Sequence, residues 1–320
     1  MYYIGVDLGG TNIATAVINE NYEIIGKGGV PTNCPRPAEE IAKDIAKSID
    51  LAIADAGVSK DEINSVGIGS PGAVNAEEGV IEFAGNLGFE NVPLAKLVEK
   101  YSGKKCFVEN DANAAAYGEY IAGAGKGSKN FIAVTLGTGV GGGIIIDGKI
   151  FSGWNSFGAE LGHTTLIMNG EPCTCGRKGC FEAYASATAL IRQTKAAMEQ
   201  DKNSKMWEIA GSLDKVNGKT AFDGMRAGDE TAKKVCDQYI EYIACGIVDI
   251  INTFQPEFVC IGGGISKEKD NLRIPIEKYV DKYRFGKTAK KKTAIKIAQL
   301  GNDAGIIGAA FLGLKYFLVI

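Results

Sequence analysis

The amino-acid sequence predicts an α/β protein built from two similar domains. Its 320 residues are enough for about two domains. Strand patterns and amphipathic helix patterns both occur along the chain. A unit made of a strand, a Gly/Thr turn, a second strand and a polar turn occurs in residues 2–21 and again in residues 131–148. Such a repeat indicates a duplicated supersecondary unit.

The first copy of this unit begins at the N-terminus. Strands are expected at Tyr2–Val6, Ile13–Ile18 and Glu23–Lys27, and a Gly/Thr turn at residues 7–12 joins the first two. A helix is expected after Pro37, because isoleucines recur at every fourth position and so share one face, namely Ile41, Ile45, Ile49 and Ile53. Further strands are expected at Asn64–Gly69 and Cys106–Val108, and an Ala-rich helix begins at Asp111.

The second copy is followed by a long helix and a third glycine-rich turn. Strands are expected at Phe131–Thr135 and Gly142–Ile146, with a hairpin turn at residues 147–148. Apolar residues at helical spacing predict a helix over Asp229–Asn252, and the strand Phe258–Ile261 leads directly into a glycine-rich turn. The apolar stretch from Gly305 to Ile320 predicts a buried terminal helix, because it is too short to cross a bilayer.

The composition favours a cytoplasmic protein that binds neither nucleic acid nor membrane. The formal net charge is −3, whereas nucleic-acid binders usually carry a basic surplus. The short basic run at Lys287 and Lys290–Lys292 is interpreted as a solvated face. No basic and apolar leader precedes the first strand, so we expect no signal peptide. The eight cysteines are then expected in a reducing compartment, where metal binding is more common than disulfides.

Two Gly/Thr turns and the third glycine-rich turn predict a nucleotide site. Glycines at strand ends expose backbone N–H groups that can hold phosphate oxygens, threonine hydroxyls add donors, and the carboxylate of Asp7 can hold a hydrated Mg²⁺. The sequence contains neither a P-loop nor a dinucleotide-binding glycine motif, so those two nucleotide folds are not supported. The candidate ATP-binding residues are Asp7, Gly9, Gly10, Thr11, Asn12, Gly137, Thr138, Gly139, Gly262, Gly263 and Gly264.

The segment Glu109–Asn113 contains the candidate catalytic base. Asp111 lies between two asparagines at a strand-to-helix junction, where a carboxylate can accept the proton of an acceptor hydroxyl during phosphoryl transfer. Asp111 taken alone is more simply explained as the N-cap of the following helix. The neighbouring phosphate-binding turns favour the catalytic role.

A cluster of cysteines with the single histidine predicts a zinc site. His163, Cys173, Cys175 and Cys180 lie within eighteen residues, and glycines between the cysteines permit a tight knuckle. Three thiolates and one imidazole form a closed tetrahedral set for Zn²⁺. Closed sets are usually structural, so the metal is expected to shape the loop rather than to take part in the reaction.

Two glutamates flank the predicted knuckle. Glu160 and Glu182 could bind a polyhydroxylated ligand, because carboxylates accept hydrogen bonds from neighbouring hydroxyls and discriminate against analogues that lack them. Solvated surface glutamates are the alternative explanation, and the residues themselves leave both open.

The sequence resembles the ROK family of repressors, open reading frames and sugar kinases over essentially its whole length. The resemblance rests on residues 7–12, 109–113, 136–143 and 158–163 and on the knuckle at 173–180. Within this family the chain looks most like bacterial ATP-dependent glucokinases, including the segments at residues 67–74 and 85–89.

The resemblance implies an actin-like (ribonuclease H-like) ATPase fold with two similar α/β domains around a central cleft. It implies a small domain of residues 1–117 plus 301–320, a large domain of residues 118–300 with the zinc knuckle at 163–180, and a homodimer. It also implies ATP-dependent phosphorylation of glucose, with Mg²⁺ bound near Asp7. The implied sugar contacts are Asn86, Asn110, Asp111, Glu160, His163 and Glu182. One ring nitrogen of His163 would bind zinc while the other reaches a sugar hydroxyl.

Three alternatives to a glucokinase were considered. A kinase for N-acetylmannosamine, N-acetylglucosamine, fructose or allose could use the same polar residues. A ROK transcriptional repressor would need a helix-turn-helix ahead of the first strand, and the phosphate turn already begins at Asp7. A cytoskeletal or chaperone-like ATPase of the same fold would have no use for the knuckle or for the glutamates at 160 and 182.

Overall fold

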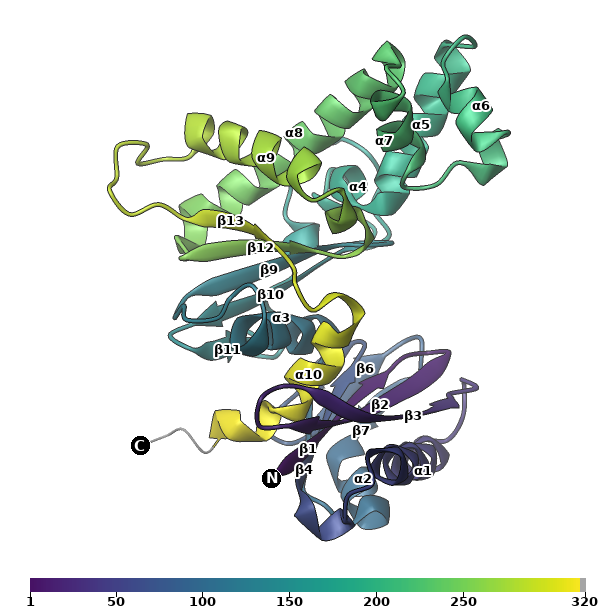
Figure 1. Cartoon of the computed structure of the whole chain (residues 1–320), viewed down its shortest axis with the longest axis vertical. Coiled ribbons are helices and arrows are strands. Elements are labelled where there is room, and N and C mark those ends of the chain that lie inside the picture. Colours follow the sequence, from purple (N-terminus) through teal and green to yellow (C-terminus); the bar gives the residue numbers. More distant parts are fainter. Residues whose placement is uncertain (317–320) are drawn as a thin grey trace. The chain divides into compact units, whose positions relative to one another are not determined.

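The computed structural model describes residues 1–316 and contains three β-sheets and ten α-helices in that range (Figure 1). The first sheet has the strand order β3-β2-β1-β4-β8 and the second has β11-β10-β9-β12-β13. In the first sheet β1 to β3 are antiparallel and β4 and β8 run parallel to β1, and in the second β12 lies parallel to both β9 and β13. The matching orders confirm the predicted duplication.

The first half of the chain also forms a small third sheet that the sequence did not predict. It has the order β5-β6-β7 and lies within residues 73–92. The strands before the second Gly/Thr turn are β1 (Tyr2–Leu8), β2 (Asn12–Asn19), β3 (Ile24–Pro31), β4 (Ile63–Ser70), β5 (Ala73–Asn75), β6 (Val80–Ala84), β7 (Phe89–Val92), β8 (Cys106–Asn110) and β9 (Phe131–Leu136).

The remaining elements are mostly helical. The later strands are β10 (Val140–Ile146), β11 (Lys149–Phe151), β12 (Phe258–Gly262) and β13 (Ala294–Ile297). The helices are α1 (Ala38–Ala56), α2 (Leu94–Ser102), α3 (Asp111–Ala122), α4 (Glu182–Ala185), α5 (Ala187–Gln200), α6 (Met206–Ala210), α7 (Thr220–Arg226), α8 (Glu230–Phe254), α9 (Asp270–Tyr283) and α10 (Ala304–Ala310). No helix of residues 1–316 is long and apolar enough to cross a membrane.

The chain divides into two compact units. The first contains residues 1–130, 143–159 and 299 onward, and the second contains residues 131–142 and 160–298. The division runs through β10, so the two units are not consecutive blocks of sequence. The domain boundaries implied by the family resemblance stay a prediction.

Glycines on both faces of the first sheet let helices pack closely against it. A Cβ on Gly5 would overlap the backbone of Ile306 in α10, and a Cβ on Gly28 would overlap the backbone of Ser48 in α1. The isoleucine stripe of α1 is buried at all four predicted positions. The sheet is therefore covered by α1 on one face and by α10 on the other.

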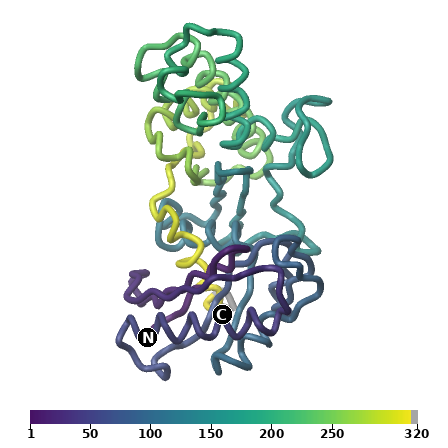
Figure 2. The backbone as a smooth tube through the Cα atoms, turned by 90° about the vertical axis from the view of Figure 1, so that its right-hand side faces the viewer, coloured from purple at the N-terminus to yellow at the C-terminus, as the bar shows by residue number. Residues whose placement is uncertain are grey.

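The C-terminal segment folds onto the N-terminal strands of the same unit. Figure 2 shows this yellow segment beside the purple strands, and α10 packs against β1 and α3. The predicted terminal helix is shorter than expected, because the α-helix ends at Ala310 and a 3₁₀ helix follows at Leu312–Tyr316. Glycines at 305, 308 and 313 lower the helix propensity of this stretch. The last four residues of this predicted helix, 317–320, lie outside the part of the chain that the structure describes.

Candidate functional site

The first Gly/Thr turn is fixed by backbone hydrogen bonds and by Thr32. The Gly9 N–H donates to the Asn12 carbonyl at 3.0 Å. The Thr32 hydroxyl donates to the Gly9 carbonyl at 2.7 Å, and the Thr32 N–H donates to the Thr11 carbonyl at 2.8 Å. Thr32 is fully buried and was not singled out from the sequence, because its role depends on a strand that lies 20 residues further along. These three hydrogen bonds hold the turn against the end of β3.

Asp7 and Asn86 lie next to this turn. Asp7 is the penultimate residue of β1, where it pairs with Gly69 of β4, and its side chain is exposed at the strand end. Desolvation by the surrounding protein raises the pKa of Asp7 above its ordinary value of 3.8. A Cβ placed on Gly10 would lie 3.6 Å from the Cβ of Asn86, so the exposed Asn86 borders the turn. The structure therefore brings these two predicted site residues together with the first turn.

The N-cap of α3 is Asn110 and not Asp111. The Asn110 Oδ1 accepts hydrogen bonds from the Ala112 and Asn113 N–H groups at 2.9 and 3.1 Å, and its Nδ2 donates to the Gly72 carbonyl at 3.0 Å. Asp111 is then the first residue of the helix, with an exposed side chain whose Oδ1 accepts from the Ala112 N–H at 2.8 Å. The simpler explanation of Asp111 as the helix cap is therefore wrong.

A buried glutamate supports the Asn110–Asp111 junction from beneath. Glu109 is 1% exposed, and its Oε1 accepts from the Asn110 N–H at 3.0 Å and from Asn113 Nδ2 at 3.1 Å. A carboxylate that accepts two donors in the interior fixes the direction of the residues that carry them. The sequence motif contains Glu109, but nothing in the spacing indicated this supporting role.

The second and third glycine turns lie at the ends of neighbouring strands in the second unit. Gly262 of β12 pairs with Thr135 of β9, so the turns at residues 137–139 and 262–264 follow adjacent strand ends. Gly263 has a φ of 80°, and a Cβ there would overlap the Leu136 backbone, so only glycine fits this close approach. The Ser266 hydroxyl donates to the Gly263 carbonyl at 2.7 Å.

The second turn is also tied to the start of α5. The Ala187 N–H donates to the Gly137 carbonyl at 2.8 Å, and the Thr188 hydroxyl donates to the Thr138 carbonyl at 2.7 Å. These contacts consume carbonyl groups rather than N–H groups. The Gly137 N–H donates to the Gly139 carbonyl at 3.0 Å within the turn. The N–H groups of Thr138 and Gly139 are therefore the ones that could bind an anion, which is the property that the sequence predicted for this turn.

The predicted metal ligands converge within the second unit. The ligand atoms of His163, Cys173, Cys175 and Cys180 all lie within 4.8 Å of one another. Cys175 Sγ is 3.6 Å from Cys180 Sγ, and His163 Nδ1 is 3.6 Å from Cys173 Sγ. Zn–S and Zn–N bonds of about 2.3 and 2.0 Å place neighbouring ligand atoms of a tetrahedron about 3.5–3.8 Å apart. The geometry therefore fits a tetrahedral metal ion with Nδ1 as the imidazole ligand atom.

The thiols differ in how readily they ionise. A hydrogen bond from the Arg177 backbone N–H lowers the pKa of Cys175, whereas burial raises the pKa of Cys180 to about 12. Gly176 and Gly179 both have positive φ, and a Cβ on Gly179 would overlap the Ile167 backbone. These glycines permit the two tight bends that bring the cysteines onto the histidine.

The two flanking glutamates have different surroundings. Glu160 is exposed at the start of the 3₁₀ helix Leu161–His163, where its carbonyl accepts the His163 N–H at 3.0 Å. Glu182 is half-buried, and its Oε2 accepts the Val140 N–H at 2.9 Å directly after the second turn. Its Oε1 accepts from Thr174 Oγ1 at 3.2 Å. Glu182 thus joins the second glycine turn to the metal knuckle.

Comparison with known proteins decides the family. The model of the ROK family matches residues 3–315. The chain belongs to the ROK family. This ROK protein is 39% identical over 308 residues to a glucokinase of Thermotoga maritima, covering 96% of this chain and 95% of that protein. It is 38% identical over 315 residues to a glucokinase of Halalkalibacterium halodurans, covering 97% and 94%.

Solved structures confirm the predicted fold class. A ROK family glucokinase from Streptomyces griseus, solved in complex with glucose and AMPPNP, matches with a TM-score of 0.79 and 36% identity. The match covers 98% of this ROK protein and 99% of that chain. The family resemblance and the actin-like α/β fold expected from the sequence are both confirmed.

Proposed function

We propose that this ROK protein is a glucokinase, which transfers the γ-phosphoryl group of ATP to the C6 hydroxyl of glucose. The observation that carries the proposal is the position of Asp111, an exposed carboxylate at the first residue of α3 whose capping role is already filled by Asn110. Full-length similarity to two glucokinases and to a glucose-bound ROK structure supports the same activity.

Asp111 acts as the general base. Its carboxylate orients the C6 hydroxyl and accepts its proton as the oxygen attacks phosphorus, while the bond from the γ-phosphorus to the bridging oxygen of ADP breaks. The cap by Asn110 and the buried Glu109 fix the direction of Asp111, so the base is positioned before substrate binds. Binding through fixed groups avoids reorganisation during the reaction.

The glycine turns bind the phosphates of ATP. Backbone N–H groups in residues 9–12, 137–139 and 262–264 would donate to phosphate oxygens without side chains in the way, apart from those of Gly9 and Gly137, which donate within their own turns. Asp7 would hold Mg²⁺, which supplies charge neutralisation on the phosphate oxygens when it is bound with ATP.

Zinc would be held by the closed set of His163, Cys173, Cys175 and Cys180. Its function is structural, because four protein ligands leave no open position for substrate. With Nδ1 on the metal side, the Nε2 of His163 is left to bind a sugar hydroxyl, in a tautomer that the metal fixes. We place Asn86, Asn110, Glu160 and Glu182 among the remaining sugar contacts, with Glu182 also orienting the second turn. We further propose a cytoplasmic homodimer that serves glycolysis.

A coupled ADP-release assay tests the substrate. We expect glucose to give the highest kcat/KM in a panel that also contains N-acetylmannosamine, N-acetylglucosamine, fructose and allose. A better substrate within this panel would replace glucose and leave the kinase activity in place. ATP consumption that no sugar stimulates would contradict the kinase assignment itself.

A further inference from the structure

Two residues between β3 and α1, Thr32 and Arg36, are connected to the first Gly/Thr turn by hydrogen bonds. Thr32 is fully buried, and it donates its hydroxyl to the Gly9 carbonyl and its N–H to the Thr11 carbonyl. Both contacts use carbonyl groups of the turn. They leave the N–H groups, which an anion would need, on the turn itself.

The hydrogen bond to the Gly9 carbonyl also fixes the direction of the next N–H group. The carbonyl of Gly9 and the N–H of Gly10 belong to one planar trans peptide unit, in which they point in opposite directions. Because the Thr32 hydroxyl holds this carbonyl, the Gly10 N–H is turned away from Thr32. Within residues 1–316 the Gly10 N–H donates to no acceptor, so it is left for a ligand.

Arg36 holds the carbonyl of Thr32 in the same way. Its Nε and Nη2 donate to that carbonyl at 3.0 and 2.6 Å, and Nη2 also donates to Asp44 Oδ2 of α1 at 2.6 Å. The Arg36 side chain is only 24% exposed. Hydrogen bonds from a charged donor are stronger than those between neutral groups. The guanidinium therefore fixes the Thr32 backbone to the first turn of the chain after β3 and to α1.

The contact with Arg36 coincides with an interruption in the ladder between β2 and β3. The register places Thr11 opposite Thr32, one position beyond the pair of Asn12 and Pro31. Residues opposed in this way normally exchange two hydrogen bonds. Here the Thr32 N–H donates to the Thr11 carbonyl, but in residues 1–316 the Thr11 N–H has no acceptor. The carbonyl that would accept it is bound by Arg36 instead.

We propose that Arg36 and Thr32 position the first turn for ATP, so that the N–H groups of Gly10 and Thr11 both face a phosphate oxygen. Neither Arg36 nor Thr32 touches the nucleotide. Thr32 acts by holding a carbonyl of the turn, and Arg36 acts by holding the carbonyl of Thr32. The proposal rests on the proposed binding of ATP phosphates by residues 9–12.

Variants of Thr32 test its hydroxyl. Thr32→Val removes the hydroxyl at nearly constant shape, whereas Thr32→Ser keeps it. We expect Thr32→Val to weaken the binding of Mg²⁺–AMPPNP about three- to tenfold in titration calorimetry and to raise KM for ATP by a similar factor, which corresponds to the loss of one hydrogen bond. KM for glucose should change less than about twofold. Thr32→Ser should restore nucleotide binding close to that of the wild type.

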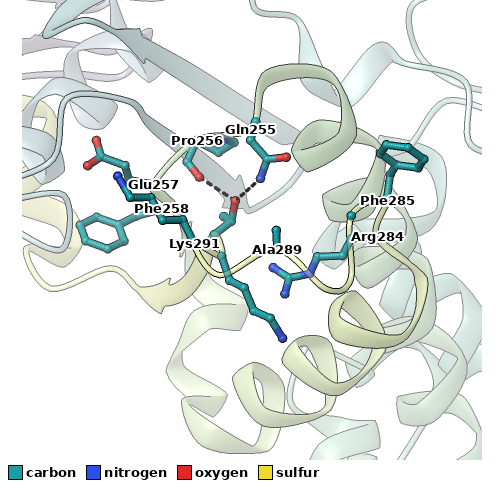
Figure 3. A pocket seen from close by; sticks show the side chains of 11 residues that line it. Gln255, Pro256, Glu257, Phe258, Arg284, Phe285, Ala289 and Lys291 are labelled. Atoms are coloured by element: carbon teal, nitrogen blue, oxygen red, sulfur yellow. Dashed lines mark hydrogen bonds between the residues drawn. The ribbon is translucent and has the colours of Figure 1, made fainter.

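Thr293→Val is the matched control. Thr293 is also buried, and its hydroxyl donates to a backbone carbonyl, that of Pro256, at 2.6 Å. Figure 3 shows this hydrogen bond as the dashed line that ends on Pro256. Thr293 precedes β13 at the end of the second sheet where β12 begins, whereas the third glycine turn follows the other end of β12. Thr293→Val should lower Tm but leave nucleotide binding unchanged.

Variants of Arg36 test the second contact. Arg36→Met should weaken nucleotide binding to the same degree as Thr32→Val. Arg36→Lys keeps the charge beside Asp44, but an ammonium lacks the planar fork of donors, so we expect an intermediate loss. Arg273→Met is the control, because Arg273 is 29% exposed and also pairs with two carboxylates, but lies in α9 and contacts no glycine turn. It should leave nucleotide binding unchanged.

Two results would overturn the positioning role. One is a lower Tm in Thr32→Val and Arg36→Met with unchanged nucleotide affinity, and the other is an equal rise in KM for ATP and for glucose. If Arg36→Met does not fold, Arg36→Lys decides. The titrations need no sugar, so a wild-type protein that binds nucleotide but phosphorylates no sugar would contradict the proposed function alone. A wild-type protein that binds no nucleotide would contradict both.

Discussion

Glu182 Oε2 accepts the backbone N–H of Val140 at 2.9 Å, which couples the metal knuckle to the strand that follows the second glycine turn. The other oxygen accepts from Thr174 Oγ1 and lies 3.5 Å from Cys173 Sγ. A Cβ on Gly139 would overlap this carboxylate, so a larger residue there would have to displace the Glu182 side chain from the Val140 N–H. The knuckle and the turn are therefore held in one arrangement by a single side chain.

Replacing Glu182 with glutamine should loosen this link. Glutamine keeps one carbonyl acceptor and turns the other oxygen into a donor, so one of the two donors loses its acceptor. We expect the free energy of unfolding to fall by about 1–3 kcal/mol, together with a lower kcat/KM for glucose. Glu160→Gln is the control, because its exposed side chain should leave Tm unchanged. An unchanged Tm in Glu182→Gln would contradict the structural role.

Asp111→Asn separates catalysis from folding. Asn110 caps α3, so the substitution keeps the cap, and Tm should change little. Loss of the base should lower kcat by about 10²–10⁴-fold, while glucose binding without ATP stays measurable. Asn110→Ala provides the contrast, since removing the cap should cost about 0.5–2 kcal/mol of stability. A near-normal kcat in Asp111→Asn would rule out Asp111 as the base.

Features with local sequence signals were predictable. The α1 stripe follows from its four-residue spacing, and the metal ligands follow from four residues that lie within eighteen positions. The glycine turns lie at strand ends as their sequence indicated. In each of these cases the residues that interact are close in the chain, so their spacing carries the information.

Features that depend on distant partners were not predictable. Thr32 and Ser266 lock two of the glycine turns through single hydroxyl contacts that leave no periodic pattern. The strands β5 to β7 are three to five residues long, too short for an alternation to be read. Asn110 and Asp111 are both good N-cap residues, and only the backbone geometry shows which one caps α3.

The metal site predicts about one zinc ion for each chain. Cys175→Ser should lose the metal and lower Tm, because a closed site contributes its binding free energy to folding. Elemental analysis and thermal unfolding measure both effects. Cys245→Ser, a half-buried cysteine of α8 outside the metal set, should keep both the metal and the Tm. Wild-type protein without zinc after preparation free of chelators would contradict the site.

Asp229 predicts a pH dependence of stability. Its burial acts to raise its pKa, but hydrogen bonds from the Ala232, Lys205 and Thr231 N–H groups and the Ser204 side chain outweigh burial and hold the pKa below its ordinary 3.8. A lowered folded-state pKa adds stability above pH 3.8 that is lost as the pH falls through the folded value.

Asp229→Asn should therefore lose about 1–3 kcal/mol at pH 7, because the amide nitrogen replaces one of the two oxygens that accept the Ala232 and Lys205 N–H groups. The difference from wild type should shrink as the pH falls from 3.8 through the lower folded-state pKa of Asp229, because the unfolded chain is protonated first and the folded protein last. Urea unfolding of both proteins at a series of pH values measures this difference in the free energy of unfolding. Asp61→Asn, at an exposed aspartate, is the control and should show no such convergence. A difference that stays constant down to pH 2 would contradict the role of the charge.

Glu119 is the residue that fixes the returning C-terminal segment to α3. It is 3% exposed, and its two oxygens accept the N–H groups of Ala124, Gln299 and Leu300 at 2.7–3.1 Å. Glu119→Gln places an amide donor against one of these N–H groups. The free energy of unfolding should then fall by about 1–3 kcal/mol. Hydrogen exchange should quicken in α10, which follows Leu300 after the 3₁₀ helix Gly301–Asp303 and packs on α3.

The exposed Glu90→Gln serves as the control and should change neither quantity. Faster exchange confined to α3, with α10 unaffected, would mean that Glu119 stabilises its own helix only. Because α10 covers one face of the first sheet, release of this segment should also expose β1 and β4 to exchange. Concerted exchange of α10 with those strands is therefore the expected signature of Glu119 as the anchor of the C-terminal segment.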